Sequence, residues 1–215
     1  MRPAPVTRSV LVLPLTGDGE RIAREITSQV ESVLVLVPGV RVVPGARLPR
    51  RPHTLSDLRT IGTLINVGTI LYGDLTLEDK TMRVTVRLGE LPRDSALWAG
   101  DFTRDMSEAT QLAREIADSV ARTLHNAAGM IALAPADSGE PFRTAQERLE
   151  TSRRLDRDGK LDEALREVRR AHELDPLATD IHAQYVEMLE RTGRRSEAQM
   201  EARQLRRIKE YLGAP

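Results

Sequence analysis

The chain has 215 residues, of which 32 are Lys or Arg and 32 are Asp or Glu, so its formal net charge at neutral pH is zero. This balance argues against a dedicated nucleic-acid or anionic-membrane protein, whose surface would carry an excess of basic residues. Cysteine is absent, which excludes disulfide bonds, thiolate metal ligands and cysteine nucleophiles.

Length and hydropathy limit the domain count and the location. A chain of this size is expected to hold one or two domains. No stretch approaches the roughly 18 apolar residues of a membrane-spanning helix, and Met1 to Arg8 lack the apolar segment of a signal peptide. We therefore expect the chain as given to be cytoplasmic, or periplasmic if it is excised from a membrane-anchored parent.

The first half of the chain switches between strand and helix patterns. The apolar run Val10–Leu13 predicts a buried strand, and a helical period predicts a helix from Glu20 to Val37. Alternation of apolar and polar residues at 82–88 predicts a strand of a hairpin with one wet face. Further elements are expected as a strand at 40–43, a helix capped by Ser56 and Asp57 and ended by Gly68, strands at 69–77 and 97–102, and a helix capped by Ser107. This order is typical of an α/β domain with a mixed sheet.

Short motifs in this half follow a recognisable order, which is Ser9-Val10-Leu11-Val12-Leu13-Pro14, Pro38-Gly39-Val40-Arg41-Val42-Val43, Tyr72-Gly73-Asp74, Arg83-Val84-Thr85-Val86 and Leu97-Trp98. Together they resemble the TolB N-terminal-like α/β domain over about residues 8 to 126. In that family the domain often precedes tetratricopeptide (TPR) repeats in bacterial signalling proteins. The resemblance therefore implies domain 1–126 and a helical-repeat region after it.

Residues 127–140 are rich in Ala, Gly, Pro and Ser. We interpret them as an inter-domain linker, with a helix extension that docks the two domains as the alternative.

The last third of the chain, 141–215, contains an internal repeat. Gly159 recurs as Gly193, 34 residues later, and Ala164 recurs as Ala198 at the same interval. Each unit reads as a helix, a turn at the Gly and a second helix, with Pro176 closing the first unit. These residues resemble the TPR repeat, with small residues such as Ala164 and Ala171 letting paired helices approach. The chain is therefore expected to form two TPR-like helical hairpins.

Leading helices of such stacks line a concave groove, and side chains not used for packing point into it. By helical phase the candidates for partner binding are Gln146, Arg153, Asp156, Arg157, Asp180, Ala183, Glu187 and Arg191. Arg153 and Arg157, one turn apart, could hold a peptide carboxylate through charge-assisted hydrogen bonds. The alternative is an ordinary solvated helix face. Since two repeats make a shallow groove, they are expected to lean on the α/β domain, on a partner's repeats or on another copy.

Other candidate chemistry is weaker. The turn Thr16–Gly19 follows a strand and precedes a helix, but Ile22 stands where a dinucleotide fingerprint needs a third small residue. His172 and His182 could meet at the junction of the repeats, yet a metal site would need further ligands that the sequence does not clearly offer. Neither a Gly-x-Ser-x-Gly motif nor a paired Cys/His arrangement occurs. Basic residues of the last helix are interpreted as a solvated face.

We therefore predict a non-enzymatic protein that binds proteins or peptides, without metal, cofactor, nucleic acid or membrane insertion. It would act as a sensor or scaffold in a bacterial signalling or envelope system, and could form a homo-oligomer. The alternative is a small-molecule sensor whose ligand lies near Gly17–Gly19 and Arg47–Arg51 of the α/β domain, with the repeats as a structural element.

Overall fold

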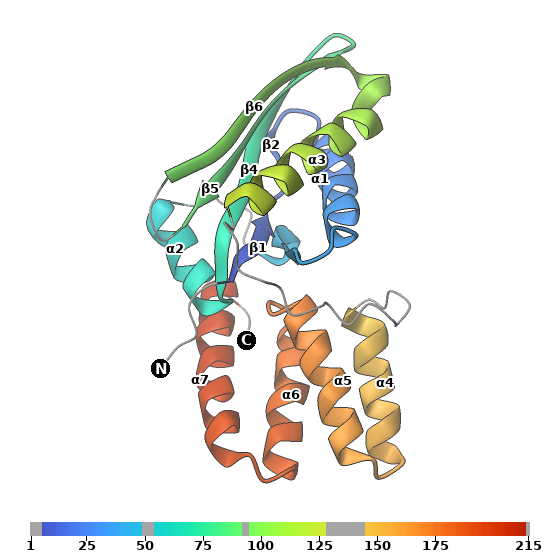
Figure 1. Cartoon of the computed structure of the whole chain (residues 1–215), viewed down its shortest axis with the longest axis vertical. Helices are drawn as coiled ribbons and strands as arrows, with labels where there is room; N and C mark the ends of the chain where they lie inside the picture. Colours follow the sequence, from blue (N-terminus) through green and yellow to red (C-terminus); the bar gives the residue numbers. More distant parts are fainter. Residues whose placement is uncertain (1–5, 49–53, 92–94, 128–144, 214–215) are drawn as a thin grey trace. The chain divides into compact units, whose positions relative to one another are not determined.

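A computed structural model of the protein describes residues 6–48, 54–91, 95–127 and 145–213. The chain divides into two compact units (Figure 1). The first, the α/β unit, is built on a sheet and the helices up to α3, and the second, the helical unit, contains α4 to α7. Their elements are β1 Val6–Val12, β2 Thr16–Gly17, α1 Glu20–Val35, β3 Arg41–Pro44, the 3₁₀ turn η1 Gly45–Arg47, α2 Leu55–Leu64, β4 Val67–Glu78, β5 Thr81–Glu90, β6 Ser95–Asp105, the 3₁₀ turn η2 Met106–Glu108, α3 Ala109–Ala127, α4 Ala145–Arg157, α5 Leu161–Leu174, α6 Thr179–Arg191 and α7 Arg195–Leu212.

The sheet is mixed and has six strands, in the order β3-β1-β4-β5-β6, with β2 paired to β4 off this path. β1 runs parallel to β3 and β4, whereas β4, β5 and β6 form an antiparallel meander. The predicted fold class, an α/β domain followed by a helical one, is confirmed. The expected linker lies outside the described residues except for Ala127.

The continuous apolar run of β1 reflects burial on both faces of the sheet. Val10 and Leu11, which point to opposite faces, are both 0% exposed. Because parallel strands are covered on both sides, they read as unbroken apolar sequence rather than as alternation. The strand therefore forms the centre of the α/β unit.

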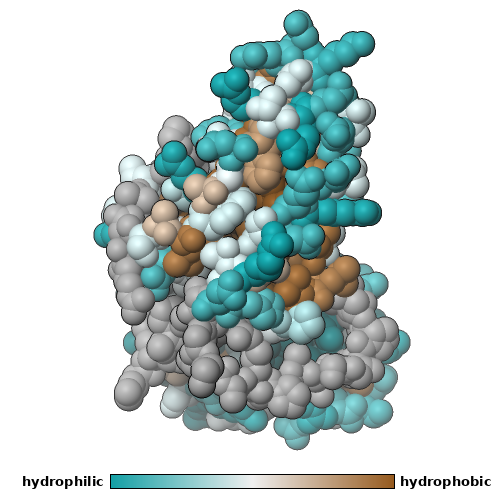
Figure 2. All heavy atoms as spheres, turned by 45° about the horizontal axis from the view of Figure 1, so that its top comes forward, coloured by the Kyte–Doolittle hydropathy of each residue, from teal (hydrophilic) through white to brown (hydrophobic). Residues whose placement is uncertain are grey.

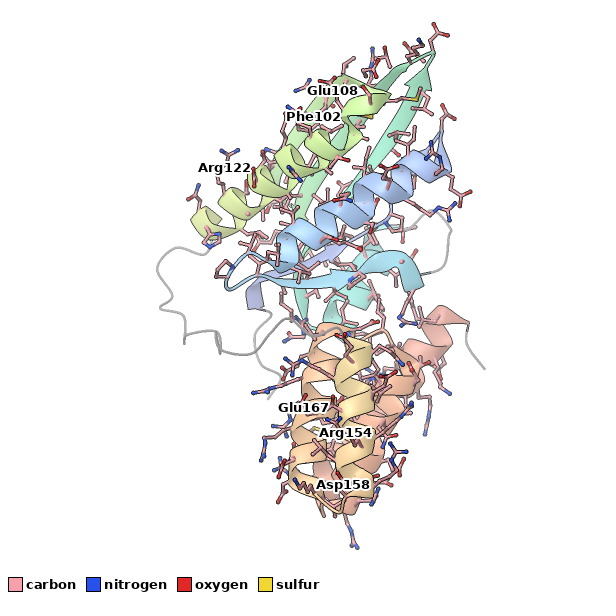
Figure 3. All side chains as sticks on the ribbon, turned by 90° about the vertical axis from the view of Figure 1, so that its right-hand side faces the viewer. Phe102, Glu108, Arg122, Arg154, Asp158 and Glu167 are labelled. Atoms are coloured by element: carbon pink, nitrogen blue, oxygen red, sulfur yellow. The ribbon has the colours of Figure 1, made fainter. Side chains whose placement is uncertain are left out.

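The meander instead has one dry and one wet face. Met82, Val84, Val86 and Leu88 of β5 are buried, and the residues between them are wholly or partly exposed. α1 and α3 lie side by side over the dry face (Figures 1 and 3). Phe102 of β6, labelled in Figure 3, packs against this core, so the predicted hairpin with one wet face is confirmed.

Two helix starts differ from the sequence prediction. α2 is capped by Thr54 rather than Ser56, because the Thr54 hydroxyl accepts from the Asp57 amide at 3.1 Å while the Asp57 carboxylate accepts from the Thr54 amide at 3.0 Å. α2 also ends at Leu64, before Gly68, and Asn66 takes the positive φ of 53°. Before α3, Asp105 rather than Ser107 forms the capping box, with Glu108 as its partner. Both corrections follow one rule, since the reciprocal pair three residues apart satisfies two amides at once.

The helical unit consists of two hairpins with the same turn. Gly159 and Gly193 have φ of 75° and 78°. After each glycine, an amide reaches back five residues, from Lys160 to the Leu155 carbonyl at 2.9 Å and from Arg194 to the Leu189 carbonyl at 2.8 Å. This bond belongs to the Schellman ending of a helix, which requires a left-handed residue and so favours glycine. Both hairpins, α4–α5 and α6–α7, thus have the helix–turn–helix form that the sequence predicts.

Small side chains let the paired helices approach closely. Ser152, Ala164, Ala171 and Ala198 are buried, and the Ser152 hydroxyl donates to the Ala164 carbonyl at 2.8 Å. A hydroxyl buried without a partner would be costly, so this bond is what allows a serine between α4 and α5. The core of the unit is completed by Leu149, Leu165, Val168, Ala178, Ile181, Tyr185, Met188 and Leu189.

Replacing Asp105 by Ala should lower the thermal midpoint of unfolding followed by fluorescence of Trp98, the only tryptophan. Hydrogen bonds from the Ser107 hydroxyl and amide hold the pKa of Asp105 below its ordinary value. A carboxylate with a depressed folded-state pKa stabilises above its unfolded pKa and loses that contribution as the pH falls. The difference between wild type and Asp105→Ala should therefore be present at pH 7 and shrink below about pH 4. Asp118→Ala, at an exposed position of α3, is the control, and an unchanged difference at pH 3 would contradict the assignment.

Replacing Gly159 by Ala should cost about 1 kcal/mol of unfolding free energy, because a Cβ disfavours the left-handed conformation. Among the described residues other than its two chain neighbours, none has an atom within 4 Å of the position that the Cβ would take, so the cost comes from the backbone. Gly159→Asn should cost less, since asparagine tolerates this conformation. Urea unfolding followed by circular dichroism measures both. If Gly159→Ala and Gly159→Asn lost the same unfolding free energy, the cost would not come from the left-handed backbone conformation.

Candidate functional site

Side chains of α4 and α6 line a surface hollow of about 560 Å³ in the helical unit. Its lining consists of Glu150, Arg153, Asp156, Arg157, Gln184 and Glu187. All six residues are polar or charged, so the hollow suits a hydrated, hydrogen-bonding partner rather than an apolar one.

Four of the eight residues predicted to bind a partner line this hollow, namely Arg153, Asp156, Arg157 and Glu187. Arg191 lies beside it, since its guanidinium binds the Asp156 carboxylate at 2.6 Å and approaches Glu187 at 3.8 Å. Gln146, Asp180 and Ala183 are exposed but do not belong to its lining.

Sequence reasoning missed two lining residues, Glu150 and Gln184. Each stands one helical turn before a residue that was selected, Glu150 before Arg153 and Gln184 before Glu187. Because residues three apart share a helix face, the same phase argument could have found them.

Charges in the hollow are unevenly paired. Asp156 and Arg191 join α4 to α6, and this hydrogen bond raises the pKa of Arg191. The second carboxylate oxygen of Asp156, Oδ1, is buried and has no hydrogen-bond partner among the described residues. Arg153 and Arg157 are exposed, and no side chain in the described part of the chain bonds to either guanidinium. The hollow thus offers the two guanidinium groups of Arg153 and Arg157 and the exposed carboxylates of Glu150 and Glu187 to a ligand.

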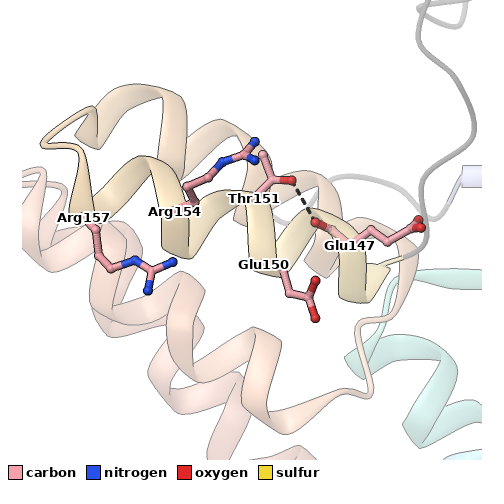
Figure 4. A pocket seen from close by; sticks show the side chains of 5 residues that line it. All are labelled: Glu147, Glu150, Thr151, Arg154 and Arg157. Carbon is pink, nitrogen blue, oxygen red and sulfur yellow. Dashed lines mark hydrogen bonds between the residues drawn. The ribbon is translucent and has the colours of Figure 1, made fainter.

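A second hollow, of about 420 Å³, lies along the same helix and shares Glu150 and Arg157 with the first. Figure 4 shows these two side chains on one side of α4, with Thr151 and Arg154 on the other. On that other side, the Thr151 hydroxyl donates to the Glu147 carbonyl at 2.9 Å. A polar outer side is what the first helix of a stacked array needs in order to remain soluble.

The turn Thr16–Gly19 of the α/β unit is occupied by its own sheet. Thr16 and Gly17 pair with β4, and the Asp18 amide donates to the Leu75 carbonyl at 2.8 Å. An anion-binding loop needs amides that point at the ligand, and here one of them is used by β4. Of the other residues predicted for a small-molecule ligand, 49–51 lie outside the described residues, and Arg47 stands at the end of η1.

A hollow inside the α/β unit is too small for a ligand. It measures about 10 Å³, which is at the lower limit of the room that one water molecule needs. Its lining is mainly apolar and includes Ile26, Leu71 and Val86. The surface of this unit seen in Figure 2 mixes hydrophilic residues with smaller apolar areas. The small-molecule alternative stays a prediction.

The two histidines of the repeat junction do meet. The rings of His172 and His182 lie 4.2 Å apart, and Glu201 of α7, which the sequence reasoning did not select, contacts both. Burial by itself would raise the pKa of Glu201, but the hydrogen bond with His182, together with His172 and Arg169 nearby, keeps it below its ordinary value. Glu201 is therefore an ionised carboxylate at neutral pH.

Among the helices that the structure describes, none combines the length and the apolar character needed to cross a membrane.

Comparisons with known proteins found structural similarity of low sequence identity over part of the chain. No family model and no curated protein matches the chain. Among solved structures, TolB from Acinetobacter baumannii is 16% identical over 60% of this chain with a TM-score of 0.44, and the match spans 29% of TolB. Two structures of a PelC dodecamer from Paraburkholderia phytofirmans are 17% and 16% identical, cover 56% and 57% of this chain and 94% and 91% of PelC, and have TM-scores of 0.41 and 0.38. These likenesses carry no information on what the chain binds.

Proposed function

We propose that this chain is a non-enzymatic binding protein whose helical unit is TPR-like and recognises an extended, polar segment of a protein in the α4–α6 hollow. The observation that carries the proposal is the pair of guanidinium groups, Arg153 and Arg157, that have no partner among the described residues. Two arginines one turn apart can bind a carboxylate by charge-assisted hydrogen bonds, which are stronger than neutral ones.

The remaining groups of the hollow fit the same ligand. Glu150 and Glu187 complement basic side chains of the ligand, while Arg153 and Arg157 take an acidic one or the terminal carboxylate. A segment with both charges is therefore the expected partner.

The biological setting is a proposal from sequence. Residues 8–126 resemble the TolB N-terminal-like domain, which in bacterial signalling proteins often precedes TPR repeats. We accordingly place the chain in a bacterial signalling or envelope system, as its sensing or scaffolding part. A second copy of the chain is one possible partner, because two hairpins form a shallow stack that gains from further helices.

The double variant Arg153→Ala/Arg157→Ala should weaken binding of acidic peptides at least tenfold, since each lost charged hydrogen bond costs about 1.5–3 kcal/mol. Fluorescence anisotropy of a labelled peptide library with free carboxyl ends measures this, at two salt concentrations. The matched control is Arg203→Ala/Arg207→Ala, which removes two exposed cations with the same spacing from α7.

Equal losses in the two double variants would contradict the proposal, because binding would then follow net charge alone. Wild-type protein that binds no member of the library would contradict recognition of a carboxylate. Light scattering of the wild type and the Arg153→Ala/Arg157→Ala variant across concentrations identifies a second copy as partner, through a loss of mass in the variant.

A further inference from the structure

Three potential metal ligands from consecutive helices converge inside the helical unit. The Oε2 atom of Glu201 lies 3.0 Å from Nε2 of His182 and 3.8 Å from Nε2 of His172. One ligand atom from each residue can be chosen so that all three lie within 4.8 Å of one another. Two imidazoles and a carboxylate form a donor set that zinc commonly takes.

Helix positions explain the convergence. His172 stands in the last turn of α5 and His182 in the first turn of α6, and the connection between the two helices is short. The packing of α7 on α6 then brings Glu201 to His182, 19 residues away in sequence. Each helix contributes one ligand, so an ion at this place would join α5, α6 and α7.

The spacing of the donor atoms fits a tetrahedral ion. Bonds of about 2.0–2.1 Å to nitrogen and oxygen place neighbouring ligand atoms of a tetrahedron about 3.3 Å apart. The two separations from Glu201, 3.0 and 3.8 Å, lie on either side of this value. We propose that His172, His182 and Glu201 bind a divalent transition-metal ion of the zinc class, with water as the fourth ligand.

Burial permits both entry and retention of the ion. The His182 side chain is 0% exposed, whereas His172 and Glu201 are 12% and 26% exposed. The ion can therefore enter past two partly exposed ligands and reach a third in the interior, where its attraction to the carboxylate is less screened than at the surface.

Neighbouring groups limit the affinity. Arg169 on α5 places a positive charge near Glu201, and its guanidinium is hydrogen-bonded to the Tyr185 hydroxyl at 3.3 Å. Nδ1 of His182 is buried without a hydrogen-bond partner among the described residues, so no second group orients this ring. Removing a group that hydrogen-bonds the second ring nitrogen of a metal-bound histidine typically lowers metal affinity 10–100-fold. We accordingly expect binding in the micromolar range rather than the far tighter binding of zinc fingers.

The test uses the full chain, freed of metal with a chelator, and zinc ion as the probe. Isothermal titration should give one Zn²⁺ per chain at micromolar affinity, and saturating Zn²⁺ should raise the unfolding midpoint by about 5 °C. Co²⁺ added in place of zinc should give the visible absorption of a tetrahedral site. Glu201→Gln and His172→Gln should each weaken Zn²⁺ binding at least tenfold and abolish the rise in midpoint.

The matched control is His125→Gln, which changes an exposed histidine of α3 and should leave zinc binding unaltered. Glu201 and His172 are partly exposed, so their variants are expected to fold, and circular dichroism checks this. The proposal is overturned if wild-type protein needs millimolar Zn²⁺, or if Glu201→Gln and His172→Gln bind Zn²⁺ as tightly as wild type.

Discussion

Close approach of paired helices is the constraint on which the helical unit depends. Ser152 and Ala164 meet between α4 and α5, where the serine hydroxyl bonds to the alanine carbonyl at 2.8 Å. A larger residue at either place would need room that a close-packed interior does not have. On the same α4, Asp156 binds Arg191 of α6, and side chains of α4 and α6 line one hollow.

The α/β unit depends on a different requirement, which is that its central strand β1 is buried on both faces of the sheet. Helices α1 and α3 cover one face of the sheet, and the interior they form leaves little empty space. Its connection between β1 and α1 is fixed to β4 through backbone pairing of β2. Packing and backbone pairing thus account for the sheet and the turn before α1, whereas the helical unit includes polar groups that packing does not explain.

Those unexplained polar groups are of two physical kinds. Arg153 and Arg157 are exposed on a helix surface, where water solvates them and a ligand can displace that water at little cost. His182 is fully buried and bonded to Glu201, so its environment is fixed by three packed helices. An exposed pair suits reversible contact with another chain, and a buried cluster suits a lasting link between helices.

The sequence alone determined the elements and their order, because strand alternation, helical phase and glycine turns are local properties. The repeat of Gly159 as Gly193, for example, predicted two hairpins whose turns share the same hydrogen bond. Helix caps at Thr54 and Asp105 were also encoded locally, because each forms a reciprocal pair with an acidic residue three positions later. Helical phase likewise predicted four of the six residues that line the α4–α6 hollow.

Only the tertiary structure decided which distant side chains meet. Asp156 and Arg191 are 35 residues apart, and Glu201 is 19 from His182. Their pairing depends on the axial shift and rotation of one packed helix against the next, which the periodicity of either helix leaves open. For that reason nothing in the sequence indicated Glu201 as a third ligand. Helical phase predicted Asp156 as a groove residue, although Arg191 binds one of its oxygens.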